Sequence, residues 1–301
     1  MYDIIILGSG PAGLTAALYC GRASKETLVL GGTVLGGQTA EIALLENYPG
    51  WHGSGFDLIE FMRKQAESFG AKISMNSAAH IEQTSDGTFI VTDTHDKKYE
   101  ARSVILATGA SPKKLEIEGA RELFGRGVSY CATCDGFFYT DKTVLVIGGG
   151  NSALNDALYL ADIAKTVKII YRKSEFTRAE DILRKRISEK KNIECVFNTE
   201  LKKIAQTPDS ENGELVATTT DGREITCDGV FVAIGHEANT DYLTEEIKRD
   251  DMGRIAPSSL PRGMFIAGDI YSNMKMQVAT AVGTGCSAAM DAIAYLNANA
   301  Q

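Results

Sequence analysis

The sequence predicts an α/β fold with two domains, each built on a central parallel sheet with an antiparallel β-sheet appended to it. Two observations predict this fold. A buried strand, a glycine-rich turn and a helix follow one another twice in the 301 residues, at residues 2–22 and 143–163. Each repeat is followed by strand-forming residues with an Asp-Gly turn, at residues 71–106 and 194–233. Both repeats therefore have the pattern of a Rossmann-like dinucleotide-binding domain.

The composition is that of a folded, acidic protein. Hydrophobic residues make up 44% and charged residues 23%, with 6 prolines, which excludes a disordered or fibrous chain. The net charge is -8 and no run of Lys and Arg stands out, so we expect no nucleic-acid or membrane partner. Ile4–Gly21 is uncharged, but glycines interrupt it and no positive leader precedes it. We therefore expect a cytoplasmic protein rather than a membrane span or a signal sequence.

The first repeat begins with a strand at residues 2–7 and continues into a helix at Leu14–Arg22. Between them, Gly8 permits the tight turn, Gly10 lets the backbone approach a pyrophosphate, and Gly13 lets the helix pack closely on the strand. The helix N-terminus then faces the phosphates. This arrangement predicts a dinucleotide site.

The second repeat has the same layout. A strand at Thr143–Ile147 leads into Gly148–Ala153, and a helix follows at Leu154–Ile163. The last small position is alanine instead of glycine, which the dinucleotide fingerprint allows. A second dinucleotide site is therefore expected in the same chain.

The two repeats differ after their second strands. Thr27–Leu30 ends at Gly31 and Gly32, with no acidic residue to hold a ribose hydroxyl. The strand Thr166–Ile170 is followed by basic residues, which favour a cofactor with a 2′-phosphate and hence NADPH. These are Arg172, Lys173 and Arg178. The alternative interpretation is a solvated basic turn, because surface Lys and Arg are common.

Cys131 and Cys134 form a Cys-x-x-Cys pair just before the second repeat. A zinc site would need two more ligands at close spacing, and the other cysteines and the histidines are scattered. We therefore predict a redox-active dithiol and no metal. The remaining cysteines are expected to be buried, inert thiols: Cys20, Cys195, Cys227 and Cys286.

The order of motifs closely resembles the low-molecular-weight thioredoxin reductases, a family of pyridine nucleotide-disulfide oxidoreductases, from end to end. The hexapeptide Cys-Ala-Thr-Cys-Asp-Gly at 131–136 is the most specific of them. The others are Gly-Ser-Gly-Pro-Ala-Gly at 8–13, Gly-Gly-Gln at 36–38, Glu-Asn-Tyr-Pro-Gly at 46–50, Ala-Thr-Gly at 107–109, Gly-Gly-Gly-Asn-Ser-Ala at 148–153, Ala-Ile-Gly at 233–235 and Gly-Asp at 268–269.

The resemblance implies FAD in the first nucleotide site and NADPH in the second. The FAD-binding domain would be discontinuous, with residues 1–113 and 244–301. The NADPH-binding domain, residues 114–243, would lie between them and carry the dithiol. Residues 110–117 and 236–244 would be connecting strands or hinges that let one domain rotate on the other.

The resemblance also implies the cofactor contacts. For FAD these are Gly8, Ser9, Gly10, Pro11, Ala12, Gly13, Gly37, Gln38, Asn47, Gly109, Gly268, Asp269 and Gln277. For NADPH they are Gly148, Gly150, Asn151, Ser152, Ala153, Arg172, Lys173, Arg178, Ile234 and Gly235. Asp269 has a separate rationale, because an acid after the late strand Met264–Ala267 can accept hydrogen bonds from ribityl hydroxyls; a plain turn aspartate has the same pattern.

The implied activity is that of a thioredoxin-disulfide reductase, which transfers electrons from NADPH through FAD and the Cys131–Cys134 disulfide to oxidised thioredoxin or a thioredoxin-like protein. By resemblance, Cys134 faces the flavin and Cys131 attacks the partner. Asp135 would be the acid that protonates a departing group; its alternative role is a helix N-cap. Relatives are homodimers, and the same is expected here.

Two departures from the family concern the electron donor. The family has His-Arg-Arg where this chain has Tyr171-Arg172-Lys173, and Arg178 lies one residue further on. Lysine lacks the planar fork of arginine, and Met276 stands where arginine is usual, so NADH, deazaflavin or ferredoxin stay open as donors. A small-molecule dithiol oxidase is a further alternative, although it would be expected to lose the second nucleotide loop. A peroxiredoxin-reducing flavoprotein would carry an extra N-terminal domain, and a non-catalytic redox sensor would not need two intact nucleotide sites.

Overall fold

A computed structural model describes residues 1–207, 213–272 and 274–299. Its contacts divide the chain into unit 1, Met1–Ser111 with Glu237–Gln301, and unit 2, Pro112–His236. The boundaries expected from the sequence lie a few residues later in the chain. The segments that cross between the units, β7 (Ala110–Pro112) and β16 (His236–Ala238), pair with each other as a two-stranded sheet.

Unit 1 contains a seven-stranded sheet in the order β3-β2-β1-β6-β5-β4, with β17 also paired to β6. Its strands are β1 (Tyr2–Leu7), β2 (Thr27–Leu30), β3 (Lys72–Ser74), β4 (Ala78–Gln83), β5 (Phe89–Asp93), β6 (Lys98–Leu106) and β17 (Met264–Ile266). The first part of β6 pairs antiparallel with β5, and its last part pairs parallel with β17. The long strand β6 therefore joins a parallel and an antiparallel region in one sheet.

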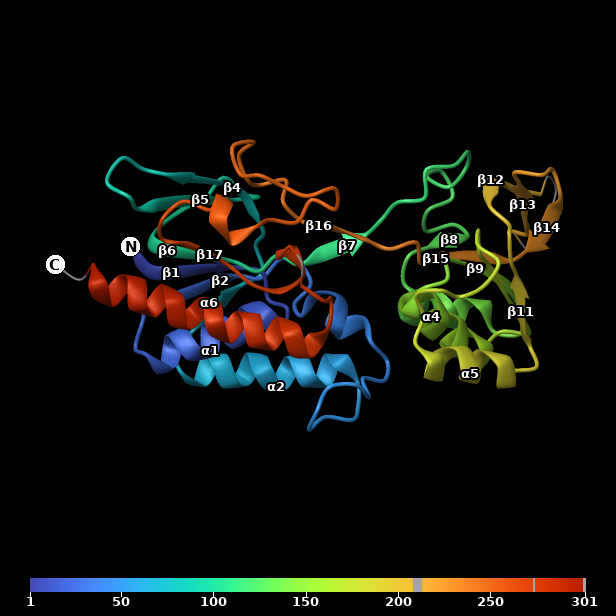
Figure 1. Ribbon diagram of the computed structural model, residues 1–301, viewed down its shortest axis with the longest axis horizontal. Coiled ribbons are helices and arrows are strands. Elements are labelled where there is room, and N and C mark those ends of the chain that lie inside the picture. Colours follow the sequence, from blue (N-terminus) through green and yellow to red (C-terminus); the bar gives the residue numbers. More distant parts are fainter. Residues whose placement is uncertain (208–212, 273, 300–301) are drawn as a thin grey trace. The chain divides into compact units, whose positions relative to one another are not determined.

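Three helices of unit 1 stack together on one face of the sheet, with α1 between α6 and α2 (Figure 1). Their bounds are α1 (Pro11–Arg22), α2 (Gly55–Ser68) and α6 (Val278–Ala298), and the 3-10 helices are η1 (Gly37–Glu41), η3 (Pro257–Ser259) and η4 (Gly268–Ile270). Helix α6 crosses α1 closely: a Cβ placed on Gly285 would lie 2.2 Å from the carbonyl oxygen of Ala12. Helix α6 therefore packs directly against the residues of the first glycine-rich turn.

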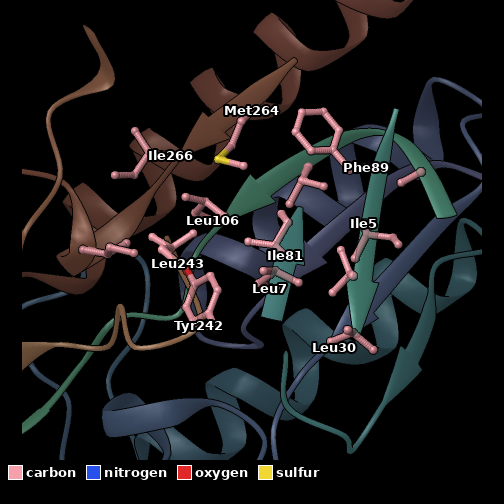
Figure 2. Close-up of a cluster of buried hydrophobic side chains, with 14 of the residues drawn as sticks. Ile5, Leu7, Leu30, Ile81, Phe89, Leu106, Tyr242, Leu243, Met264 and Ile266 are labelled. Carbon is pink, nitrogen blue, oxygen red and sulfur yellow. The ribbon is translucent and has the colours of Figure 1, made fainter. Parts of the chain in front are cut away.

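Alternate residues of β1 enter two different cores, because successive side chains of a strand point to opposite faces. Ile4 and Ile6 pack among the alanines of α1 and α6. Ile5 and Leu7 pack on the other face with Phe89 and Leu106, in the cluster drawn in Figure 2. The sheet is thus buried on both sides at β1, which accounts for the continuous apolar run in the sequence.

Unit 2 contains a five-stranded parallel sheet in the order β11-β10-β9-β15-β8, with α4 packed on β9 and β10, and α5 packed on α4. The parallel strands are β8 (Val128–Ser129), β9 (Thr143–Ile147), β10 (Thr166–Ile170), β11 (Ile193–Val196) and β15 (Gly229–Val232). A separate antiparallel sheet is formed by β12 (Leu201–Gln206), β13 (Leu215–Thr219) and β14 (Glu224–Cys227). The helices are α3 (Ala132–Asp135), η2 (Gly136–Tyr139), α4 (Asn151–Ala161) and α5 (Asp181–Glu189).

The predicted fold class is confirmed, with parallel and antiparallel sheets in both units. Four predicted strands have the observed bounds: β1, β2, β9 and β10. Both predicted helices began too late, because α1 starts at Pro11 and α4 at Asn151, directly after the glycines that cap them. No helix within the described ranges is long and apolar enough to cross a membrane.

Candidate functional site

The first glycine-rich turn joins β1 to α1 in a backbone conformation that side chains would block. Gly8 has φ +108, and a Cβ placed there would lie 2.2 Å from the carbonyl oxygen of Ala107. A Cβ on Gly13 would lie 1.9 Å from the carbonyl oxygen of Gly8. At Gly10 the nearest atom would be 3.8 Å away, so the N-terminus of α1 is left open. An open helix N-terminus beside a glycine turn suits a phosphate group.

Ser9 and Gln38, both expected to contact FAD, are tied to the protein itself. The buried Ser9 hydroxyl donates to the carbonyl oxygen of Gly31 at 2.8 Å and accepts from the amide of Gly36 at 3.2 Å. Gln38 Nε2 donates to the carbonyl oxygen of Ala110 at 2.7 Å. These two side chains therefore fasten the surrounding loops, which places the backbone around the turn.

Asp269 lies in η4, which follows β17, and its half-buried carboxylate has no hydrogen bond or ion pair to any described residue. Burial raises the pKa of this carboxyl to about 6. The preceding Gly268 packs against α1, since a Cβ on it would lie 3.0 Å from the Cβ of Ala12. The fold thus brings Asp269 beside the first glycine turn.

Three other predicted FAD residues lie in loops of unit 1. Asn47 Nδ2 donates to Oε1 of Gln277 at 3.2 Å, so residues 230 positions apart in the sequence meet. Gly109 has φ +65 and no atom within 4 Å of a Cβ placed on it. Its carbonyl oxygen accepts from the amide of Asn239 at 3.0 Å.

The second glycine-rich turn joins β9 to α4 in the same way as the first. Gly148 has φ +141, and a Cβ on it would lie 2.2 Å from the carbonyl oxygen of Ala233, the residue before Ile234 and Gly235. Gly150 caps α4 and has no atom within 4 Å on its Cβ side. A Cβ on Gly149 would lie 2.6 Å from the ring of Tyr171. The turn therefore rests on this buried ring.

Asn151 and Ser152 begin α4, and only the second has an exposed side chain free of described contacts. Asn151 Nδ2 donates to Oε1 of Glu180 at 2.7 Å, and its Oδ1 accepts from the Glu180 amide at 2.8 Å. Ala153 is fully buried against the turn. Glu180 could not be predicted from a local pattern, because its partner Asn151 is 29 positions away.

The basic segment, residues 171–180, connects β10 to α5 and exposes its three predicted cations. Arg172 is 3.9 Å from Glu200, with its side chain 66% exposed. Lys173 Nζ donates to the Thr177 hydroxyl at 3.5 Å. Arg178 has no partner among the described residues. All three cations are therefore available to an anionic ligand.

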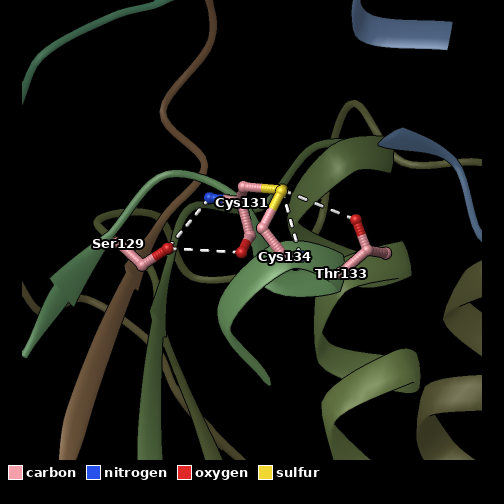
Figure 3. The surroundings of a disulfide bond; sticks show 4 residues. All are labelled: Ser129, Cys131, Thr133 and Cys134. Carbon is pink, nitrogen blue, oxygen red and sulfur yellow. Dashed lines mark hydrogen bonds between the residues drawn. A yellow bond between two sulfur atoms is a disulfide. The ribbon is translucent and has the colours of Figure 1, made fainter. Parts of the chain in front are cut away.

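Cys131 and Cys134 form a disulfide at the start of α3 (Figure 3). Ser129 holds the loop, because its hydroxyl accepts from the Cys131 amide at 3.0 Å and donates to the Cys131 carbonyl oxygen at 3.2 Å. Cys131 Sγ accepts from the Cys134 amide at 3.2 Å and from the Thr133 hydroxyl at 3.5 Å. Donors aimed at Cys131 Sγ stabilise negative charge on that sulfur.

Asp135 ends α3, and its carboxylate has no partner among the described residues. It occupies the N-cap position of η2, but its side chain makes no capping hydrogen bond there. Phe137 and Phe138 follow, with 77% and 70% of their surface exposed. This aromatic pair was not predicted, because two adjacent apolar residues in a sequence do not reveal that both side chains are exposed.

The other cysteines differ in exposure. Cys20 and Cys227 are buried, and burial raises the pKa of each thiol to about 12. Cys195 is exposed and Cys286 is half-buried, so the expectation of four buried thiols is wrong for these two. Across the described parts of the chain, no group of three or more His, Cys, Asp or Glu residues could hold a metal ion.

Comparisons with known proteins agree with this site. A family model described as pyridine nucleotide-disulphide oxidoreductase matches residues 2–285. A thioredoxin reductase of Mycolicibacterium smegmatis is 39% identical over 306 residues, covering 98% of this chain and 97% of that protein. A bifunctional thioredoxin reductase/thioredoxin of Mycobacterium leprae is 39% identical, covering 98% of this chain and 66% of that protein. The crystal structure of Lactococcus lactis thioredoxin reductase has a TM-score of 0.90 at 33% identity, covering 99% of this chain and 100% of that one.

Proposed function

The chain belongs to the pyridine nucleotide-disulphide oxidoreductase family as a flavin-dependent thioredoxin reductase, and we propose that it carries electrons from NADPH to the disulfide of a thioredoxin-like protein. The resemblance seen in the sequence is confirmed by these relatives. The observation that carries the proposal is the Cys131–Cys134 disulfide, which lies in the same unit as a glycine turn flanked by the basic segment.

The residues of unit 1 fit FAD. The open N-terminus of α1 at Gly10 would hold the pyrophosphate, and the unpartnered carboxylate of Asp269 would accept hydrogen bonds from ribityl hydroxyls. Asn47 and Gln277, whose side chains are hydrogen-bonded to each other, would also contact FAD. When bound, FAD supplies two-electron transfer between a nicotinamide and a disulfide.

The residues of unit 2 fit NADPH. The open N-terminus of α4 at Gly150 would hold the pyrophosphate, and the Ser152 hydroxyl is free in the first turn of that helix. Arg172, Lys173 and Arg178 would bind the 2′-phosphate, since all three are exposed on one segment.

The dithiol would act by thiol–disulfide exchange. The Cys131 thiolate attacks one sulfur of the partner disulfide, the other partner sulfur leaves as a thiolate, and a mixed disulfide forms. The Cys134 thiolate then attacks Cys131 Sγ, which releases the partner as a dithiol and restores the Cys131–Cys134 bond. The donors on Cys131 Sγ support its role as the attacking sulfur, and the unpartnered Asp135 would give a proton to a leaving thiolate.

A protein partner is supported by the aromatic pair beside the dithiol. Phe137 and Phe138 are exposed, and their ring centroids are 6.4 Å apart. Exposed aromatic residues are typical anchors of protein interfaces. The Mycobacterium leprae relative joins a thioredoxin reductase and a thioredoxin in its name, which supports a thioredoxin-like partner here.

We further infer a cytoplasmic homodimer. A chain that has four free cysteines in addition to a catalytic disulfide suits a reducing compartment. On α2, Phe56 and Phe61 are 59% and 65% exposed, which supports association through unit 1. Sedimentation of the FAD-loaded protein measures the mass, and a monomer at all concentrations would exclude the dimer.

The first experiment is anaerobic stopped-flow absorbance of the FAD-loaded protein mixed with NADPH, with NADH in parallel. Rapid bleaching of the flavin band by NADPH, and its recovery after oxidised thioredoxin is added, is the expected result. No bleaching by either nicotinamide would refute NADPH as donor. It would favour deazaflavin or ferredoxin, whereas bleaching by NADH would agree with Lys173 in place of arginine.

Replacement of either dithiol sulfur tests the exchange step. Cys131→Ser and Cys134→Ser should each lower the rate of thioredoxin reduction by roughly a thousandfold or more, because each sulfur forms a covalent bond in the cycle. Cys195→Ser is the matched control, since this exposed cysteine lies on β11, away from the dithiol helix. Retention of the rate in Cys131→Ser would exclude the dithiol from the reaction.

A further inference from the structure

The side chain of Asn151 is engaged by a neighbouring segment instead of being left for the cofactor. Both ends of its amide bind Glu180, one to the carboxylate at 2.7 Å and one to the backbone amide at 2.8 Å. We propose that Asn151 and Glu180 are a positioning pair that sets the place of the basic segment relative to the second glycine turn, and so determines the preference for a dinucleotide with a 2′-phosphate. This inference rests on the proposed use of NADPH.

Other contacts hold the basic segment to parts of unit 2 that do not carry the turn. At its start, the Tyr171 amide donates to Val196 and the Lys173 carbonyl oxygen accepts from the Asn198 amide, both at 3.0 Å. In its middle, the buried Phe176 accepts at its carbonyl oxygen from Arg184 at 3.2 Å. Each of these partners lies on or beside β11 or α5.

The basic segment is hydrogen-bonded to the second glycine turn through its last residue, Glu180. Within the described parts of the chain, the hydrogen bonds that join residues 171–180 to residues 148–153 are those of Asn151 with Glu180. The other links are apolar: the Tyr171 ring packs under Gly149, and Phe176 and Ala179 lie in the same buried cluster as Ala153. Loss of the pair would therefore leave the basic segment joined to the turn by apolar packing, without the directional hydrogen bonds that fix its end.

The spacing between turn and cations matters because the ligand carries its pyrophosphate and its 2′-phosphate on the same ribose, which limits their separation. A pyrophosphate at Gly150 and a 2′-phosphate at the basic segment can be bound together only if the two sites keep that separation. Long side chains such as Arg178 lose entropy on binding, and a fixed backbone reduces this cost. The pair also holds the Glu180 carboxylate, which would repel phosphate if it were released near the cations.

The test measures binding of two fragments that need no electron transfer. Adenosine 2′,5′-bisphosphate and adenosine 5′-monophosphate are titrated into the FAD-loaded protein by isothermal calorimetry, for wild type, Asn151→Ala, Glu180→Ala and Glu180→Gln. We expect Asn151→Ala and Glu180→Ala to bind the bisphosphate about fivefold more weakly, the loss that one or two hydrogen bonds would cause. Binding of the monophosphate should change by less than about twofold.

Glu180→Gln is the matched control. Its amide oxygen can accept the same hydrogen bond from Asn151, and its backbone amide is unchanged, so wild-type binding of both fragments is expected. Amide hydrogen exchange supplies a second measurement: exchange in residues 171–180 should be faster in Asn151→Ala and unchanged in Glu180→Gln.

Four results would overturn the proposed role of the pair. Equal weakening of both fragments would mean that Asn151 acts on the glycine turn itself. Unchanged binding of the bisphosphate in Asn151→Ala would show that Asn151 has no positioning role. If Glu180→Gln weakened binding as much as Glu180→Ala, the negative charge of Glu180 would be responsible and not its hydrogen bonds. A wild type that binds both fragments equally would refute the NADPH preference and the pair's role in it, and the stopped-flow experiment would show that failure independently.

Discussion

The two glycine-rich turns both join a buried strand to a helix, but they differ in how closely that helix approaches the first glycine of the turn. In unit 1, a Cβ on Gly13 would lie 1.9 Å from the carbonyl oxygen of Gly8, so only glycine fits. In unit 2 the corresponding residue is Ala153, whose Cβ lies 3.0 Å from where a Cβ on Gly148 would stand. The last small position of the motif is therefore set by helix approach, and the two helices impose different limits.

The turns also differ in which segment fills the space beside them. In unit 1 the side chain comes from the turn: Ser9 binds the carbonyl oxygen of Gly31, and a Cβ on Gly31 would lie 2.9 Å from Ser9 Cβ. In unit 2 the turn has Gly149, and the side chain comes from Tyr171 after the neighbouring strand. In both units side chains occupy the space between turn and strand end: Ser9 and Leu35 in unit 1, and Tyr171 in unit 2.

The largest effect on stability is expected when the last small residue of each glycine-rich turn is exchanged for that of the other turn. Gly13→Ala should lower the free energy of unfolding by about 3 kcal/mol or more, because its Cβ would overlap a backbone oxygen that cannot move away. Ala153→Gly should cost less, about 1–2 kcal/mol, from the difference in helix propensity and the loss of one buried methyl group. Urea denaturation of the FAD-free protein measures both, and equal losses would show that the two helices approach their turns alike.

A smaller effect is expected from crowding the second turn. Gly149→Ala should destabilise the protein by about 1–3 kcal/mol, because Tyr171 is buried and stacked on Phe176 with ring centroids 5.8 Å apart. In a Tyr171→Ala background the same change should cost much less, since the ring is gone. Additive losses in this double-mutant cycle would argue against packing of the turn on the ring.

The smallest effect on stability is expected from the half-buried carboxylate of Asp269 in unit 1. The folded pKa of Asp269 is raised to about 6 from 3.8, so the FAD-free protein loses stability as pH rises through this interval. Asp269→Asn should raise Tm at pH 8 by roughly 2–4 °C and leave Tm at pH 3.5 unchanged, while weakening FAD binding. Asp241→Asn, an exposed site in the same unit, is the control in scanning calorimetry. An equal rise in Tm at both pH values would contradict the assigned cause.

The strands and the glycine turns could be predicted because their signals are local. The apolar runs of β1, β2, β9 and β10 and the spacing of the glycines lie within a few residues of the elements they define. The helix starts were misplaced by three residues in both repeats, because the cap residue belongs to the turn and the helix at once. Glu180 had no local signal, since its function depends on Asn151 across the fold.

The family, the two dinucleotide-binding turns and the dithiol could be predicted from residue order, since each depends on a contiguous motif whose chemistry needs those residues in that order. The use of distant residues was established by the tertiary structure. It left Asp269 without a partner, engaged Asn151 with Glu180, and exposed Phe137 and Phe138 beside the disulfide. Hydrogen-bond pairing and burial depend on which segments the folded chain brings together, and a linear pattern carries no record of those distances.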